Sequence, residues 1–474
     1  MVFSSSFFLL YFLPIFLLLY YVIPQKFKNT LIVIASILFY SWGGPSYIFI
    51  IFFSIFLDFY IAKQIHKSQG SIRKKYLITG LAINLGLLLY FKYANFFVEN
   101  LNQTLLIFGK TGLDVAKVAL PIGISFFTFH EMSYLIDVYR SDKKPMTNII
   151  DYSLYILFFP QLVAGPIIRF NEISDQITNR SSSETFDNRL LGFFRFCIGL
   201  AKKVLIANVL GAEASRIFEL DPSVMPTGLA WLGAIAYTFQ IYFDFAGYSD
   251  MAIGLARMLG FKFPENFNNP YNSKSITEFW RRWHMTLSRW MRDYLYIPLG
   301  GNRVNSKFRL YFNLWIVFVL SGFWHGATWN FVIWGVYHGF FLAIERLFFE
   351  KVLHKMGSFL SVLITFIIVV VGWVFFFTDD IHHSILYLQS MFSFNPFEYV
   401  YEFNIEFIVI LGIAIFFSFI RLFKIGEILE NLTYSEQCSN FKAYVITSLS
   451  LIILVISISS ITSFGFNPFI YFRF

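Results

Sequence analysis

The two stretches that decide the fold read Phe279-Trp-Arg-Arg-Trp-His284 and, at the end of the next apolar span, Ser321-Gly-Phe-Trp-His325-Gly326. His325 lies in sequence apolar enough for membrane depth, between Gly322 and Gly326. Burying an ionisable side chain in hydrocarbon is costly, so a histidine at such a place indicates function. The two glycines form a small-xxx-small pair, which lets another backbone or a substrate approach the imidazole. We therefore expect His325 to be a functional residue inside a membrane protein.

The composition around these stretches is that of a polytopic membrane protein. Of the 474 residues, 57% are hydrophobic and 14% are charged, and 63 are Phe, whereas soluble domains carry roughly 25% charged residues. Because a membrane helix needs about 20 apolar residues, we predict an all-α fold with about 11–13 membrane segments. Several segments are short or interrupted by Gly and Pro, and we expect these to be re-entrant or broken helices.

We expect one membrane domain over residues 1–474. Within it, residues 1–110 are predicted to be scaffold helices, 119–347 the catalytic core, and 358–474 the C-terminal helices with an aromatic tail. Lys26 and Lys28 follow the first apolar span directly, so the positive-inside rule places the N-terminus outside. If the later loops alternate between the two sides of the membrane according to their charge, the C-terminus also lies outside.

The net charge of +8 does not indicate nucleic-acid binding, because the basic residues are spread over loops that fit one membrane side. Cys197 and Cys438 lack the spacing of a disulfide framework or a metal site. No histidines are spaced at i,i+3 or i,i+4, so we expect no metal ligands. The polar segment 171–190 has the composition of an ordinary cytoplasmic loop.

Residues 276–292 have the periodicity of a single amphipathic helix. Its aromatic face carries Trp280, Trp283 and Trp290, and its opposite face carries Arg281 and Arg282 with two further arginines. The pattern is typical of a helix that lies in or near the membrane interface. The arginines then either anchor the helix to anionic lipid or receive the phosphates of a soluble acyl donor, for which Arg is well shaped.

Other polar residues in apolar sequence have a structural explanation. Asp244 and Asp250 lie among Tyr and Phe, and acidic residues in that setting commonly pair with Arg or cap a helix. His338 follows Gly335-Val-Tyr, and we expect it to pack or form hydrogen bonds within the helix bundle.

The chain resembles the membrane-bound O-acyltransferases, in particular their bacterial polysaccharide (alginate-type) O-acetyltransferase branch. The resemblance covers nearly the whole chain and rests on long ordered blocks, which include the two stretches quoted above. The others are Pro121–Phe126, Tyr134–Arg140, Phe159–Pro166, Tyr242–Met251 and Asn266–Tyr271.

The resemblance implies a fold with a central tunnel and a multi-pass protein of the cytoplasmic (inner) membrane. It implies transfer of an acetyl group from a cytoplasmic thioester, acetyl-CoA, to an extracytoplasmic polysaccharide similar to alginate, with no bound cofactor. Branch members work with an exported serine-hydrolase-like acetyltransferase, and this chain has no Gly-x-Ser-x-Gly motif of its own. We therefore expect such a partner, a polysaccharide acceptor and surrounding membrane lipid.

The matching blocks also imply site residues. His325 falls on the principal catalytic histidine of the family and His284 on a second histidine block. Arg281, Arg282, Trp324 and Asn266 are predicted to bind substrate. An imidazole suits the base that acyl transfer to a hydroxyl requires.

Three alternatives stay open. Peptidoglycan O-acetylation and D-alanyl transfer to teichoic acid are related reactions within the family, and the broken helices also fit a transporter.

Similar aromatic tails recur in this branch, and Tyr471 near the chain end offers a hydroxyl. We expect Tyr471 either to rest at the membrane interface or to act as a transient acetyl carrier.

Overall fold

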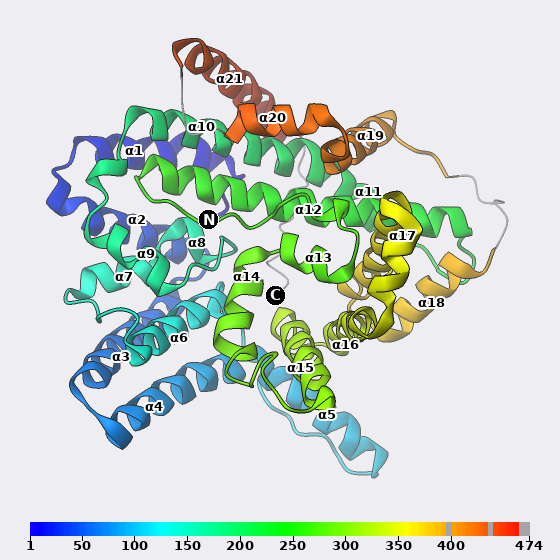
Figure 1. Cartoon of the computed structure of the whole chain (residues 1–474), viewed down its shortest axis with the longest axis horizontal. Coiled ribbons are helices and arrows are strands. Elements are labelled where there is room, and N and C mark those ends of the chain that lie inside the picture. The colour runs from blue at the N-terminus through cyan, green and yellow to red at the C-terminus, as the bar shows by residue number, and fades with distance from the viewer. Residues whose placement is uncertain (395–400, 435–438, 464–474) are drawn as a thin grey trace. The chain divides into compact units, whose positions relative to one another are not determined.

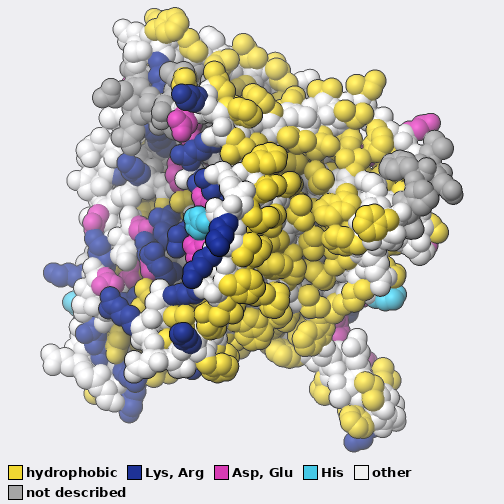
Figure 2. Space-filling model, turned by 45° about the vertical axis from the view of Figure 1, so that its right-hand side comes forward, with side chains coloured by type: hydrophobic (Ala, Val, Ile, Leu, Met, Phe, Trp, Pro, Cys, Tyr) yellow, Lys and Arg dark blue, Asp and Glu magenta, His cyan; other side chains and the backbone are white. Residues whose placement is uncertain are grey.

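The computed structural model describes residues 1–394, 401–434 and 439–463. Their regular secondary structure is entirely helical. Five helical stretches are long and apolar enough to cross a membrane, and they span Pro45–Lys67, Gly70–Ile107, Trp329–Phe377, Ile405–Leu422 and Asn440–Ser463. Figure 2 shows a broad hydrophobic surface beside a group of basic side chains. The predicted all-α polytopic membrane fold is therefore confirmed.

The described residues form two compact units. The first unit comprises residues 1–185 and 259–263. Its helices are α1 (Leu13–Val22), α2 (Lys28–Ser41), α3 (Ile48–Lys67), α4 (Gly70–Leu88), α5 (Ala94–Ile107), α6 (Ile124–Arg140), α7 (Ile149–Leu157), α8 (Phe159–Leu162) and α9 (Phe170–Thr178). The single-domain organisation expected from the sequence stays a prediction.

The second unit comprises residues 186–258 and the chain from 264 onward. Its longer helices are α10 (Phe186–Ala201), α11 (Asn208–Phe218), α12 (Thr227–Met258), α15 (Lys307–His325), α16 (Trp329–Ile344), α17 (Glu350–Phe377), α18 (Ile381–Phe392), α19 (Ile405–Phe419), α20 (Lys424–Tyr434) and α21 (Asn440–Ser463). Two short helices, α13 (Ile276–Arg282) and α14 (Met285–Met291), follow α12. All the histidines and arginines of the predicted site belong to this unit.

The core of the second unit begins with α10 and α12, which run side by side (Figure 1). Two glycine pairs, Gly192 with Gly254 and Gly199 with Gly247, allow this contact. A Cβ atom on Gly199 would lie 2.5 Å from the carbonyl oxygen of Gly247, which is closer than atoms can pack. The glycines therefore let the two backbones touch, as small residues do between membrane helices.

Ion pairs hold the same two helices together. Lys203 follows α10 and lies 2.7 Å from Asp244 of α12, with both side chains buried. Asp250 of α12 accepts from Arg195 at 2.8 Å and from Lys202 at 2.6 Å. Asp250 thus pairs with an arginine as predicted, whereas Asp244 pairs with a lysine, and both acids join neighbouring helices of the scaffold.

The segment 171–190 is not the loop that its composition suggested. It contains most of α9, a short 3-10 turn and the start of α10. Arg180 is buried and donates to the carbonyl of Leu259 at 3.1 Å, and Glu184 pairs with Lys28. Polar composition misled the prediction because these charges are satisfied by residues distant in sequence.

Candidate active site

The segment that carries His284 is two short helices with a break between them. Helix α13 ends at Arg282, and His284 has the left-handed backbone conformation, with φ 43°. This conformation is unusual for a residue with a Cβ atom and interrupts an α-helix. Two backbone hydrogen bonds of 2.9 Å hold this break: the N–H of Met285 donates to the carbonyl of Asn266, and the N–H of Asn268 donates to the carbonyl of Arg282. The continuous helix over 276–292 was therefore a wrong prediction.

The aromatic face of this segment is buried inside the protein. Trp280 packs edge-on against Trp334 with ring centroids 5.4 Å apart, and Trp283 packs against Trp373 at 4.9 Å. Trp334 belongs to α16 and Trp373 to α17. Other helices of the second unit therefore cover the face that the interfacial interpretation assigned to lipid, whereas the position of the segment near the membrane interface stays a prediction.

Helix α13 is anchored at its start by two side chains. The hydroxyl of Ser275 accepts from the N–H of Glu278 at 3.1 Å, which is a normal N-terminal cap. The buried carboxylate of Glu345 accepts from the N–H groups of Ile276 at 2.6 Å and Thr277 at 3.1 Å. A negative charge at this end also suits the helix dipole. Glu345 therefore fixes the position from which α13 presents its arginines.

His325 is the last residue of α15 and is buried. Its ring lies edge-on to Trp324 at 4.9 Å, and to Trp334 and Phe376 at 5.3 Å each. The glycines beside it allow a close approach, because a Cβ atom on Gly322 would lie 2.2 Å from the carbonyl oxygen of Phe331. The predicted approach of another backbone occurs at Gly322, where it is the backbone of α16, whereas Gly326 meets the ring of Phe331.

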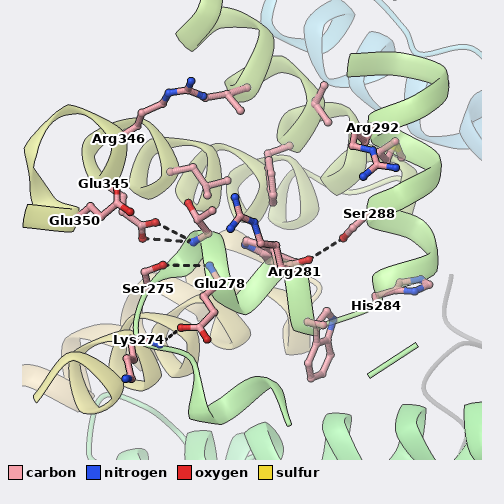
Figure 3. A pocket seen from close by; sticks show the side chains of 18 of the residues that line it. Lys274, Ser275, Glu278, Arg281, His284, Ser288, Arg292, Glu345, Arg346 and Glu350 are labelled. Atoms are coloured by element: carbon pink, nitrogen blue, oxygen red, sulfur yellow. Dashed lines mark hydrogen bonds between the residues drawn. The ribbon is translucent and has the colours of Figure 1, made fainter. Parts of the chain in front are cut away.

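A cavity of about 930 Å³ connects the two histidines. His325 and His284 both line it, together with residues from α13 to α17. Figure 3 shows this cavity with His284 and nine other lining residues labelled. Its exposed charged lining residues, here called the charged rim, are Lys274, Arg281, Arg292, Arg346 and Glu350. The cavity thus joins a mainly cationic opening to a buried imidazole.

Two adjacent arginines differ in their availability for a ligand. Arg282 donates to Glu278 at 2.7 Å and is absent from the cavity lining. Arg281 lines the cavity, is exposed, and forms no ion pair with any described residue. Since a bound anion must compete with existing partners, Arg281 is the better placed of the two to receive a phosphate.

The other predicted residues are near the histidines but outside the cavity lining. The ring of Trp324 touches that of His325, and the amide of Asn266 bonds to His284 at 3.0 Å. Tyr471 lies outside the described residues. His338 is buried with its ring 4.9 Å from Trp280 and 5.0 Å from Trp334, which confirms its predicted packing within the bundle.

Burial within the protein favours the neutral form of His284. Burial lowers the pKa of His284 to about 3, so its imidazole is uncharged at neutral pH. A neutral imidazole retains a lone pair that accepts a proton or a hydrogen bond. Among the described residues, no group of three or more His, Cys, Asp or Glu side chains is arranged to hold a metal ion.

Sequence reasoning missed several residues that build the cavity. Glu345 and Arg346 interrupt an apolar run, and this charge within a membrane segment was the signal that marked them. Arg346 lines the cavity and donates to Asn302 at 3.0 Å. Ser321 lines it one helical turn before His325, a spacing that puts both on one face of α15.

Glu345→Ala is expected to lower the free energy of unfolding by about 1.5–3 kcal/mol, because hydrogen bonds to a buried charge contribute about that much. Thermal unfolding of the detergent-purified protein measures the effect. Glu350→Ala is the matched control, since Glu350 lines the same cavity but is exposed. Equal melting temperatures for the two variants would contradict the anchoring role.

Comparison with known proteins agrees with this site. The model of the membrane-bound O-acyltransferase family matches residues 38–388, which include both histidines and the cavity. The chain belongs to the membrane-bound O-acyltransferase family. This confirms the resemblance seen in the sequence and makes the protein an O-acyltransferase, embedded in a membrane by several helices.

This O-acyltransferase is similar to curated bacterial proteins that carry several different names. A protein of Pseudomonas aeruginosa named "Probable alginate O-acetylase AlgI" is 46% identical over 400 residues, covering 84% of this chain and 76% of the relative. The peptidoglycan O-acetyltransferase of Helicobacter pylori is 37% identical, with 83% and 80% covered. The teichoic acid D-alanyltransferase of Bacillus subtilis is 30% identical, with 55% and 70% covered.

Proposed function

We propose that this O-acyltransferase transfers an acetyl group from acetyl-CoA in the cytoplasm toward hydroxyl groups of an extracytoplasmic polysaccharide similar to alginate. One observation carries the proposal, namely the cavity that runs from the charged rim to buried His325. The phosphates of a soluble thioester suit the rim, and the buried end excludes water that would hydrolyse the thioester. The 46% identity with the alginate O-acetylase supports the acceptor class.

Each residue of the site has its own role in the proposed reaction. Arg281 binds a donor phosphate and holds the thioester in the cavity. The imidazole of His325 takes the proton of the attacking hydroxyl while the oxygen bonds to the acetyl carbon. The carbon–sulfur bond breaks, and the proton passes to the departing thiolate, so the products are an acetyl ester and a free thiol. His284 contacts the donor from the α13–α14 break, and Trp324 holds the ring of His325.

The proposal includes a setting and a partner. The protein lies in the cytoplasmic membrane with both termini outside, so the donor enters from the cytoplasm and the acetyl group leaves on the opposite side. An exported serine-hydrolase-like acetyltransferase completes the transfer to the polysaccharide. Tyr471, in the aromatic tail, is the proposed hydroxyl that carries the acetyl group between them.

Peptidoglycan is the second candidate acceptor, because the alignment with the Helicobacter pylori relative covers 83% of this chain, against 84% for the alginate relative. The two acceptors separate in one experiment. Ester-linked acetate is measured on purified exopolysaccharide and on purified peptidoglycan from cells with and without the protein. Loss of acetate from exopolysaccharide alone supports the main proposal, and loss from peptidoglycan alone replaces it with the second.

Arg281→Ala is expected to raise the acetyl-CoA concentration for half-maximal transfer by about tenfold to a hundredfold, the effect of losing one charge-assisted hydrogen bond. The measurement uses purified protein in vesicles over a series of donor concentrations. Arg282→Ala is the matched control, because its guanidinium already pairs with Glu278. If both variants shift the concentration equally, the arginines act as a general positive surface and Arg281 has no specific contact.

A further inference from the structure

The side-chain amide of Asn266 is fully engaged inside the second unit. Its oxygen Oδ1 lies 3.0 Å from Nδ1 of His284, 2.9 Å from the hydroxyl of Thr286 and 3.3 Å from the backbone nitrogen of Thr286. Its nitrogen Nδ2 donates to the hydroxyl of Ser249 at 3.0 Å. All four side chains are buried, so none of these groups can exchange its partner for bulk water.

This arrangement determines which ring nitrogen of His284 carries the proton. A backbone N–H only donates, so the amide atom that faces Thr286 N must be the acceptor, which identifies it as oxygen. His284 Nδ1 contacts that same oxygen and must therefore donate to it. A neutral imidazole has one N–H, so Nε2 then carries the lone pair. Nε2 is buried and has no hydrogen-bond partner among the described residues.

The backbone reinforces this assignment. The carbonyl of Asn266 accepts from the N–H of Met285, the residue after His284. His284 itself holds the left-handed conformation, with φ 43°, which costs energy for a residue other than glycine and persists only where the surroundings fix it. The edge-on ring of Phe245, 4.7 Å away, restricts the imidazole further. Asn266 thus fixes both the position of the His284 ring and the ring nitrogen that carries its proton.

We infer that Asn266 is a positioning residue that holds His284 with its proton on Nδ1, so that Nε2 accepts a hydrogen bond from an N–H or O–H group of the donor molecule in the cavity. The inference rests on the proposed function, because it takes the cavity as the donor site. It also has a specific consequence. A neutral His284 donates its only N–H to Asn266, so it has no N–H left to stabilise the oxyanion that forms during transfer.

Nitrogen NMR of protein labelled with ¹⁵N-histidine tests the assignment without measuring activity. The signals of His284 among the eight histidines are identified by their loss in His284→Gln. We expect Nδ1 to be protonated and Nε2 to have the chemical shift of an unprotonated ring nitrogen. A protonated Nε2 in the neutral ring would overturn the inference, whatever the activity of the protein.

Three variants separate positioning from simple structural support. Asn266→Asp keeps the acceptor oxygen and is expected to keep the proton on Nδ1. Asn266→Leu removes the acceptor, and a mixture of the two ring forms should appear. Ser249→Ala is the matched control, since it removes a partner of the same amide without touching its oxygen. An unchanged NMR signature in Asn266→Leu that folds would contradict the inference.

Kinetics distinguishes failure of this inference from failure of the proposed function. Asn266→Leu is expected to lower turnover by about tenfold or more, as when an orienting partner of a histidine is lost, whereas Asn266→Asp retains more of it. If the NMR assignment holds but His284→Gln leaves transfer and donor affinity unchanged, the proton assignment stands and the proposed role of His284 at the donor site is wrong.

Discussion

His325→Ala is expected to lower acetyl transfer by about a hundredfold to ten-thousandfold, the range for removal of a general base. His325 is a buried residue that lines the cavity, and its ring contacts the rings of Trp324, Trp334 and Phe376. Because His325 is buried, its imidazole is the base closest to a hydroxyl bound beside it. Loss of the imidazole therefore leaves the hydroxyl proton without a nearby acceptor.

Ester-linked acetate on polysaccharide purified from cells with matched membrane levels of each variant measures this effect. His325→Gln accompanies the alanine variant, because it fills more of the space and separates lost chemistry from a packing defect. His382→Ala is the control for histidine replacement in general, since His382 is exposed on α18. Near wild-type acetate in both His325 variants would exclude His325 as the base.

Lys203→Met is expected to lower the free energy of unfolding by about 3–5 kcal/mol, the usual result of removing one partner of a buried ion pair. Lys203 and Asp244 are 2% and 0% exposed, so neither charge is stabilised by solvent. The substitution removes the lysine that pairs with the carboxylate of Asp244 in the α10–α12 interface. The folded protein should then be lost from membranes or unfold at a lower temperature.

The temperature at which detergent-solubilised protein loses its monodisperse state measures this stability. Lys202→Met is the matched control: its partner Asp250 retains Arg195, and Lys202 is 23% exposed. A second substitution, Asp244→Leu in the Lys203→Met background, removes the buried carboxylate that lost its lysine and should restore most of the loss. Equal behaviour of the Lys202 and Lys203 variants would show that burial of the pair contributes little.

The outline of the site was accessible from the sequence because it depends on local features. An imidazole between two glycines in an apolar span marks His325 without any knowledge of neighbouring helices. The long ordered blocks also indicated the family before the fold was known. The assignment of catalytic and binding roles to individual residues stays a prediction, which the variants above test.

The errors have a common physical cause. The periodicity of residues 276–292 fits a continuous helix. In the structure, however, the N–H of Asn268 donates to the carbonyl of Arg282 and the carbonyl of Asn266 accepts from the N–H of Met285, and these bonds stabilise a break. The tryptophans suggested contact with lipid, whereas Trp334 and Trp373 cover them. Periodicity reports that a face is apolar, and it does not report whether lipid or protein covers that face.

The sequence by itself determined the membrane class, the all-α fold and the family, because these follow from composition, span length and extended residue patterns. Only the tertiary structure decided which of two adjacent arginines is available, since Glu278 pairs with Arg282 and leaves Arg281 to the cavity. The inferred position of the proton on the His284 ring also depends on the tertiary structure, because the amide that accepts it lies 18 residues away in sequence. Hydrogen bonds and ion pairs between distant residues depend on three-dimensional proximity, which local sequence does not encode.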